Sequence, residues 1–238
     1  MAKPKSKAEE LNKPNIILCE GADAYYFIIW YLDWLKKRNE NEFENFRAVN
    51  FGGNEELNRA LKSILKDPNY DDSIKSLLII RDSETDHKAA IQSIQSALET
   101  ANFPIPQKPH NVAEGLKPNY SQNIKVAFTL FPTLSEESKI GTLEDLFIEN
   151  LAENNVENVL NEVDKFVNYL KTNGRNFGHI HKSKLHAYFA ITDENSVNGV
   201  ANNSYIGAKV GEAARDGAFN FDFKTMNSLK SLFLEIMC

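Results

Sequence analysis

Short apolar runs alternate with segments of helical periodicity through the first half of the chain. Runs of this length, apolar at almost every position, are typical of strands buried on both faces of a parallel sheet. We expect such strands at 16–19, 47–51, 77–80 and 125–131. Apolar residues at helical spacing predict helices at 23–37, 57–65 and 86–100. This alternation predicts an α/β fold with a mostly parallel sheet, joined by right-handed crossovers and flanked by helices.

The second half of the chain is expected to be richer in helix. Apolar spacing predicts helices at 143–151, 156–170 and 225–237, whereas the short apolar stretch 184–191 fits either a helix or a strand. The segments 102–123 and 192–204 are rich in proline or asparagine and are expected to be loops. We expect residues 1–13 to form a flexible tail and residues 14–238 to form a single α/β domain.

Composition and charge narrow the class of protein. The 238 residues are 42% hydrophobic and 25% charged, which is typical of a soluble globular chain. Cys19 and Cys238 lie far apart without a CxxC pair, which argues against a disulfide framework or a zinc site. The dense apolar run 25–35 is too short to span a bilayer and no signal peptide is visible, so we expect a cytoplasmic protein without membrane contact. A net charge of −6 argues against broad electrostatic adhesion to nucleic acid.

Acidic residues follow the predicted strands and begin a later helix. They are Glu20 and Asp23 after the first strand, Asp82, Glu84 and Asp86 after the third, and Glu144 with Asp145 near the start of the helix at 143–151. Ligands of open α/β sheets bind beyond the carboxyl ends of the strands. In a doubly wound sheet the first and third strands are neighbours, which would bring Glu20 and Asp82 together. Carboxylates gathered in this way favour a hard cation such as Mg²⁺ or Mn²⁺.

Each acidic residue also has a simpler interpretation. Asp23 can cap or favour the start of the following helix, and the cluster 82–86 can be a solvated loop that ends in a helix cap. Glu144 can be an ordinary charged residue in the first turn of a helix. Capping does not explain Glu20, because Glu20 precedes Gly21 and lies outside the helix.

The first two acidic motifs resemble those of the Toprim domain, which occurs in topoisomerases, primases and OLD-type nucleases. Glu20 and Asp23 match its Glu-Gly-x-Asp motif, and Asp82 with Glu84 matches its second motif, in which aspartate is more usual than glutamate at the latter position. Asp86 can take that place or add a ligand. The resemblance implies a Rossmann-like Toprim fold, in which Glu20 serves as a general acid or base and the later acids bind Mg²⁺.

Two later segments are similar to a bacterial family of unknown function related to the OLD-like Toprim proteins. These segments are 141–147, which contains Gly-Thr-Leu-Glu-Asp-Leu-Phe, and 183–188, which contains Ser-Lys-Leu-His-Ala-Tyr. The resemblance implies that Glu144 is a further metal ligand and that Lys184 contacts phosphate. Without the resemblance, Lys184 would be read as a solvated surface lysine.

Three functions follow from these patterns. The first is a Mg²⁺-dependent Toprim-type nuclease or phosphoryl-transfer protein that acts on DNA or RNA phosphodiesters, in phage defence or a mobile element. The second is a non-catalytic Toprim-like module that binds metal, nucleotide or another protein. The third is a phospho-receiver protein, which would carry its phosphate on Asp82. The acidic balance and the lack of an aromatic and basic stripe in the sequence weigh against the nuclease unless a protein partner supplies that surface.

Overall fold

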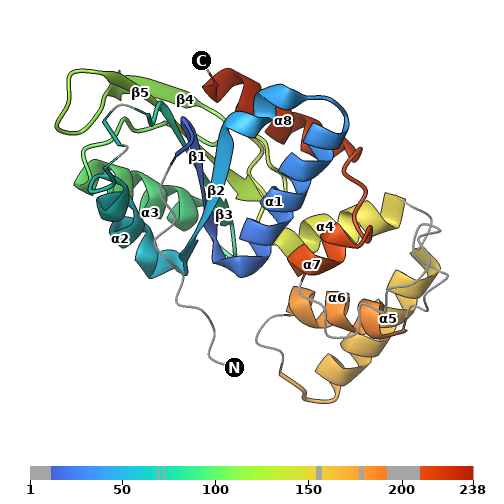
Figure 1. Ribbon diagram of the computed structural model, residues 1–238. Helices are drawn as coiled ribbons and strands as arrows, with labels where there is room; N and C mark the ends of the chain where they lie inside the picture. The colour runs from blue at the N-terminus through green and yellow to red at the C-terminus, as the bar shows by residue number, and fades with distance from the viewer. Residues whose placement is uncertain are drawn as a thin grey trace, which may run out of the picture.

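The protein is built around one sheet of five strands (Figure 1). The structure is a computed structural model, and it describes residues 12–68, 70–71, 73–153, 157–176, 180–191 and 210–237. The strands are β1 (Asn15–Glu20), β2 (Phe46–Gly52), β3 (Ser76–Asp82), β4 (Val112–Leu116) and β5 (Asn123–Phe131). They lie in the order β2-β1-β3-β5-β4. The first three strands and β5 are parallel, and β4 pairs antiparallel with β5 at the edge. The prediction of an α/β fold with a mostly parallel sheet is confirmed.

Helices cover both faces of this sheet and form most of the second half of the chain. They are α1 (Gly21–Lys37), α2 (Leu57–Ile64), α3 (His87–Thr100), α4 (Leu143–Glu153), α5 (Glu157–Thr172), α6 (Ile180–Ile191), α7 (Val210–Arg215) and α8 (Lys224–Ile236). Two short 3-10 helices precede β2 and α2, at Asn41–Asn45 and Asn54–Glu56. None of the helices described is long and apolar enough to cross a membrane.

The sheet divides the core into two layers. Along β1, Ile16 and Leu18 face the layer that contains α2 and α3, whereas Ile17 and Cys19 face the layer that contains α1 and α8. All four side chains are fully buried, which explains why the strand is apolar at successive positions. The α4 to α7 region continues the second layer beyond α1, and α5 and α6 lie farthest from the sheet (Figure 1).

Three segments differ from the sequence-based expectation or complete it. The expected loop 102–123 contains the strand β4, whose residues are half-buried or exposed and therefore lack the continuous apolar run of the other strands. The ambiguous stretch 184–191 belongs to α6. The short helix α7 was not expected. The predicted loop 192–204 and most of the predicted tail lie outside the described residues.

Candidate functional site

Acidic side chains from β1, β3 and α4 meet at the carboxyl edge of the sheet. Glu20 is the last residue of β1, Asp82 is the last residue of β3, and these two strands are parallel neighbours. Gly21 has a φ of 78° and begins α1 directly after Glu20, a conformation that glycine adopts without strain. Glu144 lies in the first turn of α4. The fold thus places the ends of two strands and the start of one helix around a common edge.

Glu20 is held by a buried arginine that the sequence did not single out. Arg81 Nε donates a hydrogen bond to Glu20 Oε2 at 2.9 Å, and Arg81 Nη1 donates to Ser93 Oγ on α3 at 3.1 Å. Only 3% of the Arg81 side chain is exposed, against 15% for Glu20. The signal in the sequence was a single charged residue at the end of an otherwise apolar strand. Such a charge requires a partner when it is buried.

The side chain of Asp82, at the end of β3, contacts the first residue of α4. Its Oδ1 accepts a hydrogen bond from the backbone N–H of Leu143, the first residue of that helix, at 2.9 Å. Burial raises the pKa of Asp82 well above its ordinary value, and the charges of Glu144, Glu84 and Glu20 raise it further against the opposing effect of the Leu143 hydrogen bond. The environment of Asp82 therefore carries an excess of negative charge, which a proton or a cation would relieve.

Lys182 on α6 is the cation that faces these acids. Its Nζ lies 3.4 Å from Oε1 of Glu144, a side chain that is buried. Burial alone would lower the pKa of Lys182, but the charges of Glu144, Asp82 and Asp23 and the hydrogen bond with Glu144 outweigh it and raise the pKa above its ordinary value. Sequence reasoning missed Lys182, because the start of α6 was not predicted.

Lys184, the lysine chosen from the sequence, points elsewhere. Its Nζ lies 2.5 Å from Oδ1 of Asp164 on α5. Side chains two residues apart on a helix point to different sides, so Lys182 and Lys184 contact different carboxylates. The arrangement therefore brings Lys182, and not Lys184, to the acidic edge.

The remaining acids have local structural partners. Glu84 forms a backbone bridge with Gly141, in which each N–H donates to the other carbonyl at 2.8 Å, and its side chain is exposed. Asp86 caps α3, because its Oδ1 accepts the N–H of Ala89 at 3.0 Å. Asp145 accepts the N–H of Thr142 at 2.8 Å and so closes the first turn of α4. Glu84 thus ties the loop after β3 to the segment before α4, whereas Asp86 has the geometry of a helix cap.

The carboxylate oxygens at this edge are the kind of ligand that a hard cation prefers. Among the described residues, no group of three or more His, Cys, Asp or Glu side chains is arranged to hold a metal ion. Mg²⁺ commonly uses only one or two carboxylates and completes its shell with water and phosphate oxygens. Asp82 and Glu144 fit that requirement, since Glu144 is buried, Asp82 is partly buried, and the charge of Glu144 raises the pKa of Asp82.

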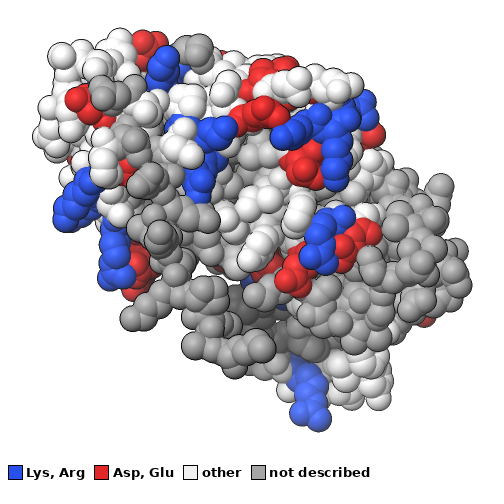
Figure 2. Space-filling view, in the orientation of Figure 1, with Lys and Arg blue, Asp and Glu red and all other residues white. Residues whose placement is uncertain are grey.

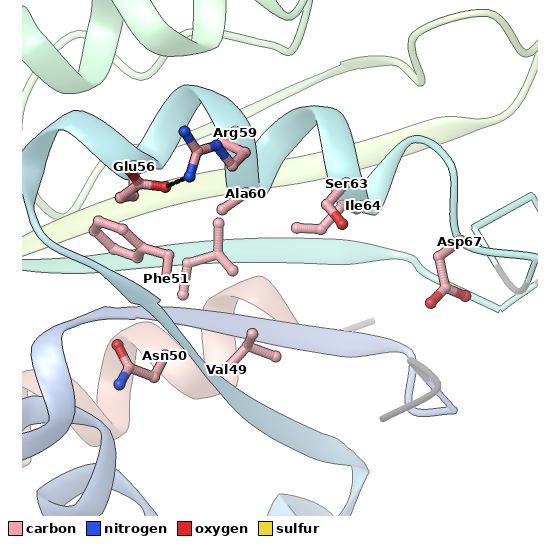
Figure 3. A pocket seen from close by; sticks show the side chains of 10 residues that line it. Val49, Asn50, Phe51, Glu56, Arg59, Ala60, Ser63, Ile64 and Asp67 are labelled. Atoms are coloured by element: carbon pink, nitrogen blue, oxygen red, sulfur yellow. Dashed lines mark ion pairs between the residues drawn. The ribbon is translucent and has the colours of Figure 1, made fainter. Parts of the chain in front are cut away.

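A separate cavity of about 330 Å³ lies between α2 and the edge strand β2. Figure 3 shows Val49 and Phe51 on one side, with the ion pair between Arg59 and Glu56 near one end. Asp67 lies at the other end (Figure 3). None of the acids proposed from the sequence lines this cavity, so it is not part of the acidic edge.

The fold and the site define an α/β protein with an acidic edge that is completed by its helical second half. The chain matches a family described as a protein of unknown function (DUF3226) over residues 14–233, and it belongs to that family. No curated protein and no solved structure matches the chain. Its function is therefore argued from the site.

Proposed function

We propose that this chain is a Toprim-type, metal-dependent phosphoryl-transfer protein that acts as a nuclease on phosphodiesters of DNA or RNA. The observation that carries the proposal is the environment of Asp82. This carboxyl group is partly buried at the carboxyl end of β3, and loss of solvent together with the charges of Glu144, Glu84 and Glu20 raises its pKa. Such a concentration of carboxylates at the ligand-binding edge of an open α/β sheet favours a divalent cation.

The side chains divide into three roles under this proposal. Asp82 and Glu144 would hold the cation, with Glu84 nearby. Glu20 would act as the general acid or base, in an orientation fixed by its hydrogen bond from Arg81. Lys182 would offset phosphate charge, which is the role the resemblance assigned to Lys184. A bound Mg²⁺ or Mn²⁺ would supply charge neutralisation and a water of lowered pKa. The resemblance to OLD-like Toprim proteins extends the proposal to a bacterial phage-defence or mobile-element system.

One observation favours the non-catalytic module instead. Glu20 is already paired with Arg81 at 2.9 Å, and Glu144 faces Lys182 at 3.4 Å. Internal cations thus partly satisfy two of the acids. A protein of this kind would bind metal, nucleotide or another protein at the same edge without cleaving a phosphodiester.

Titration with Mn²⁺ tests the metal site. Binding should be lost or weakened at least about tenfold in Asp82→Asn and Glu144→Gln, because each removes one charged ligand. Asp86→Asn is the matched control, since asparagine also caps helices and Asp86 already has that role. A wild-type protein that binds no Mn²⁺ at millimolar concentration would contradict the proposal.

Nicking assays then separate the enzyme from the module. The wild type is expected to cleave supercoiled plasmid or labelled single-stranded DNA or RNA with Mn²⁺, and Glu20→Gln to cleave at least about 100-fold more slowly, the usual scale for a general acid or base. Metal binding without cleavage of any of these substrates would favour the module. Phosphorylation of Asp82 by a small phosphodonor would favour the receiver.

A further inference from the structure

Both tryptophans of the chain line one cavity on the outer side of α1. This cavity of about 230 Å³ lies between α1 and residues 214–221, and we name it the tryptophan cavity. Trp30 and Trp34 are four residues apart on α1 and therefore lie on the same side of the helix. Phe219 and Phe221 form its buried wall. Four of the ten residues that line it are therefore aromatic.

Two cations stand at the rim of this cavity. The guanidinium of Arg215 lies over the ring of Trp30, at 5.9 Å from the ring centroid. Arg215 also donates hydrogen bonds to Asp216, and Lys37 pairs with Asp33 at 2.7 Å. The Lys37–Asp33 pair is exposed and contributes little stability, so Lys37 can exchange its carboxylate for an incoming phosphate at small cost. Arg215 holds Asp216 through Nε and Nη2, and its guanidinium has further N–H donors that a phosphate can accept from.

Trp30 also has an unused hydrogen-bond donor. Its indole Nε1 is buried and has no acceptor among the described residues. By contrast, the ring of Trp34 contacts those of Tyr31 and Phe221, with ring centroids at 5.9 and 6.0 Å. The guanidinium of Arg38 also lies 4.7 Å from the centroid of the Trp34 ring, so Trp34 is covered more closely than Trp30. A heterocycle with acceptor atoms is the kind of ligand that would satisfy the N–H of Trp30.

The helices α1 and α7 connect the tryptophan cavity to the acidic edge. The start of α7 is pressed against the start of α1, where a Cβ on Gly211 would lie 2.8 Å from the carbonyl oxygen of Asp23. Arg215, about one turn beyond Gly211, meets Trp30, about two turns beyond Asp23. Glu20 precedes Trp30 by ten residues, or about 15 Å along α1. A short stretch of an extended strand covers that distance.

We propose that the tryptophan cavity takes one unpaired base of a single-stranded nucleic acid whose phosphates extend to the acidic edge. The base displaces the guanidinium of Arg215 from the ring of Trp30 and stacks there, and Arg215 and Lys37 hold the adjacent phosphate. A base inside a duplex cannot enter such a cavity, so the site selects single strands. This inference rests on the proposed function and adds the class of substrate.

Figure 2 shows positive and negative side chains around an uncharged area on the face that carries α1. Stacking of the base, rather than overall positive charge, is therefore the main attraction between this face and a single strand.

Tryptophan fluorescence tests this proposal directly, because Trp30 and Trp34 are the only two tryptophans in the chain. The full chain is titrated in EDTA, so that neither metal nor cleavage is required. The probes are a ten-nucleotide single strand, the blunt duplex of the same sequence and a mononucleotide. Saturable quenching by the single strand is expected, at least about tenfold tighter than by the duplex or the mononucleotide. Equal responses to the single strand and the duplex would overturn the proposal, and so would a response to the mononucleotide alone.

Variants locate the binding. Arg215→Ala and Trp30→Ala should each weaken single-strand binding about tenfold, the scale of one stacked base or one phosphate contact, as measured by fluorescence anisotropy of a labelled strand. Arg215 is half-exposed, so its variant remains informative if Trp30→Ala fails to fold. Tyr169→Ala, at an exposed aromatic of α5, is the matched control and should bind as the wild type does.

The outcomes distinguish this inference from the nuclease proposal. Wild-type binding by Arg215→Ala would overturn the inference and indicate another occupant, such as a protein side chain, even if the protein cleaves nucleic acid. Single-strand binding that depends on Trp30 and Arg215 would support the inference even if Mn²⁺ binding and cleavage are absent.

Discussion

Arg81 Nε donates to Glu20 Oε2 at 2.9 Å and thereby joins the carboxyl ends of β1 and β3. The same guanidinium donates to Ser93 on α3, so one buried side chain links two strands and a helix. Removal of one partner of a buried ion pair leaves the other charge without compensation, which costs far more than the pair itself contributes. This contact therefore governs both the position of Glu20 and the stability of the acidic edge.

Arg81→Met is expected to lower the free energy of unfolding by about 3 kcal/mol, because it leaves Glu20 largely buried without its cation. Urea denaturation at neutral pH measures the loss. The double variant Arg81→Met with Glu20→Gln should recover part of it, since the uncompensated charge is then gone. A loss below about 1 kcal/mol in Arg81→Met, or simple additivity in the double variant, would show that the two side chains do not interact as described.

Asp82 should make the protein less stable as pH rises. Burial and the neighbouring Glu144 raise its pKa in the folded protein above the ordinary value of 3.8. Between the pKa of the unfolded chain and that of the folded protein, the folded state binds more protons, so stability falls with rising pH across that window. Above the folded pKa the loss is complete.

Asp82→Asn removes this dependence and should be more stable than the wild type at neutral pH in EDTA. Asparagine keeps the oxygen that accepts the Leu143 N–H. Urea midpoints for both proteins over about pH 4 to 8 give the comparison. Added Mg²⁺ should stabilise the wild type and not the variant, because a cation favours the ionised carboxylate. A difference between the two proteins that does not change with pH would refute this account of Asp82.

The sequence predicted the sheet well because its strands are buried on both faces. A short run that is apolar at every position, such as 77–80, is typical of a doubly buried strand, and the adjacency of β1 and β3 that brings Glu20 towards Asp82 follows from simple rules of topology. The strand β4 escaped prediction because it is half-exposed and is stabilised by backbone pairing with β5, which leaves no periodic pattern.

The composition of the site was harder to predict than its position. Which lysine faces the acids depends on the rotation of α6, and its first residues carry no strong apolar periodicity, so Lys182 could not be told from Lys184. The contact of Arg215 with Trp30 joins residues far apart in sequence. The packing of α7 on α1 brings together aromatic and basic side chains that form no stripe in the sequence.

Gly141→Ala should disrupt the junction between β3 and α4. Gly141 has a φ of 141°, and a Cβ there would lie 2.8 Å from Oδ2 of Asp145 and 3.1 Å from Cδ of Pro132. Strain and steric overlap together are expected to cost about 2 kcal/mol or more. Because Asp145 closes the first turn of α4, Mn²⁺ binding through Glu144 should weaken as well.

Gly53→Ala is the matched control for this change. Gly53 has a φ of −85°, and a Cβ there would have no atom within 4 Å. Thermal unfolding should show a change within about 0.5 kcal/mol for this variant, the range of ordinary surface substitutions. Equal melting temperatures for the two alanine variants would contradict the described geometry of Gly141.

Lys182 and Lys184 should respond differently to replacement by methionine. Lys182→Met leaves the buried Glu144 without its cation and is expected to lower stability by about 1–2 kcal/mol, less than a fully buried pair because Lys182 is 45% exposed. Lys184→Met breaks a pair whose carboxylate, on Asp164, is half-exposed, and should cost at most about 0.5 kcal/mol. The pKa of Lys182 is raised above 10.5, so its stabilising effect is complete at neutral pH and is lost only as the pH rises through that raised pKa.

In Lys182→Met, Mn²⁺ affinity should rise while the free energy of unfolding falls. The ammonium of Lys182 competes with a divalent cation for Glu144, so Lys182→Met is expected to bind Mn²⁺ several-fold more tightly while it unfolds at lower urea concentration. Lys184→Met should leave Mn²⁺ affinity unchanged. Calorimetric titration of both variants at neutral pH measures the two affinities. Weaker Mn²⁺ binding in Lys182→Met than in the wild type would mean that Lys182 supports the cation site instead of competing with it.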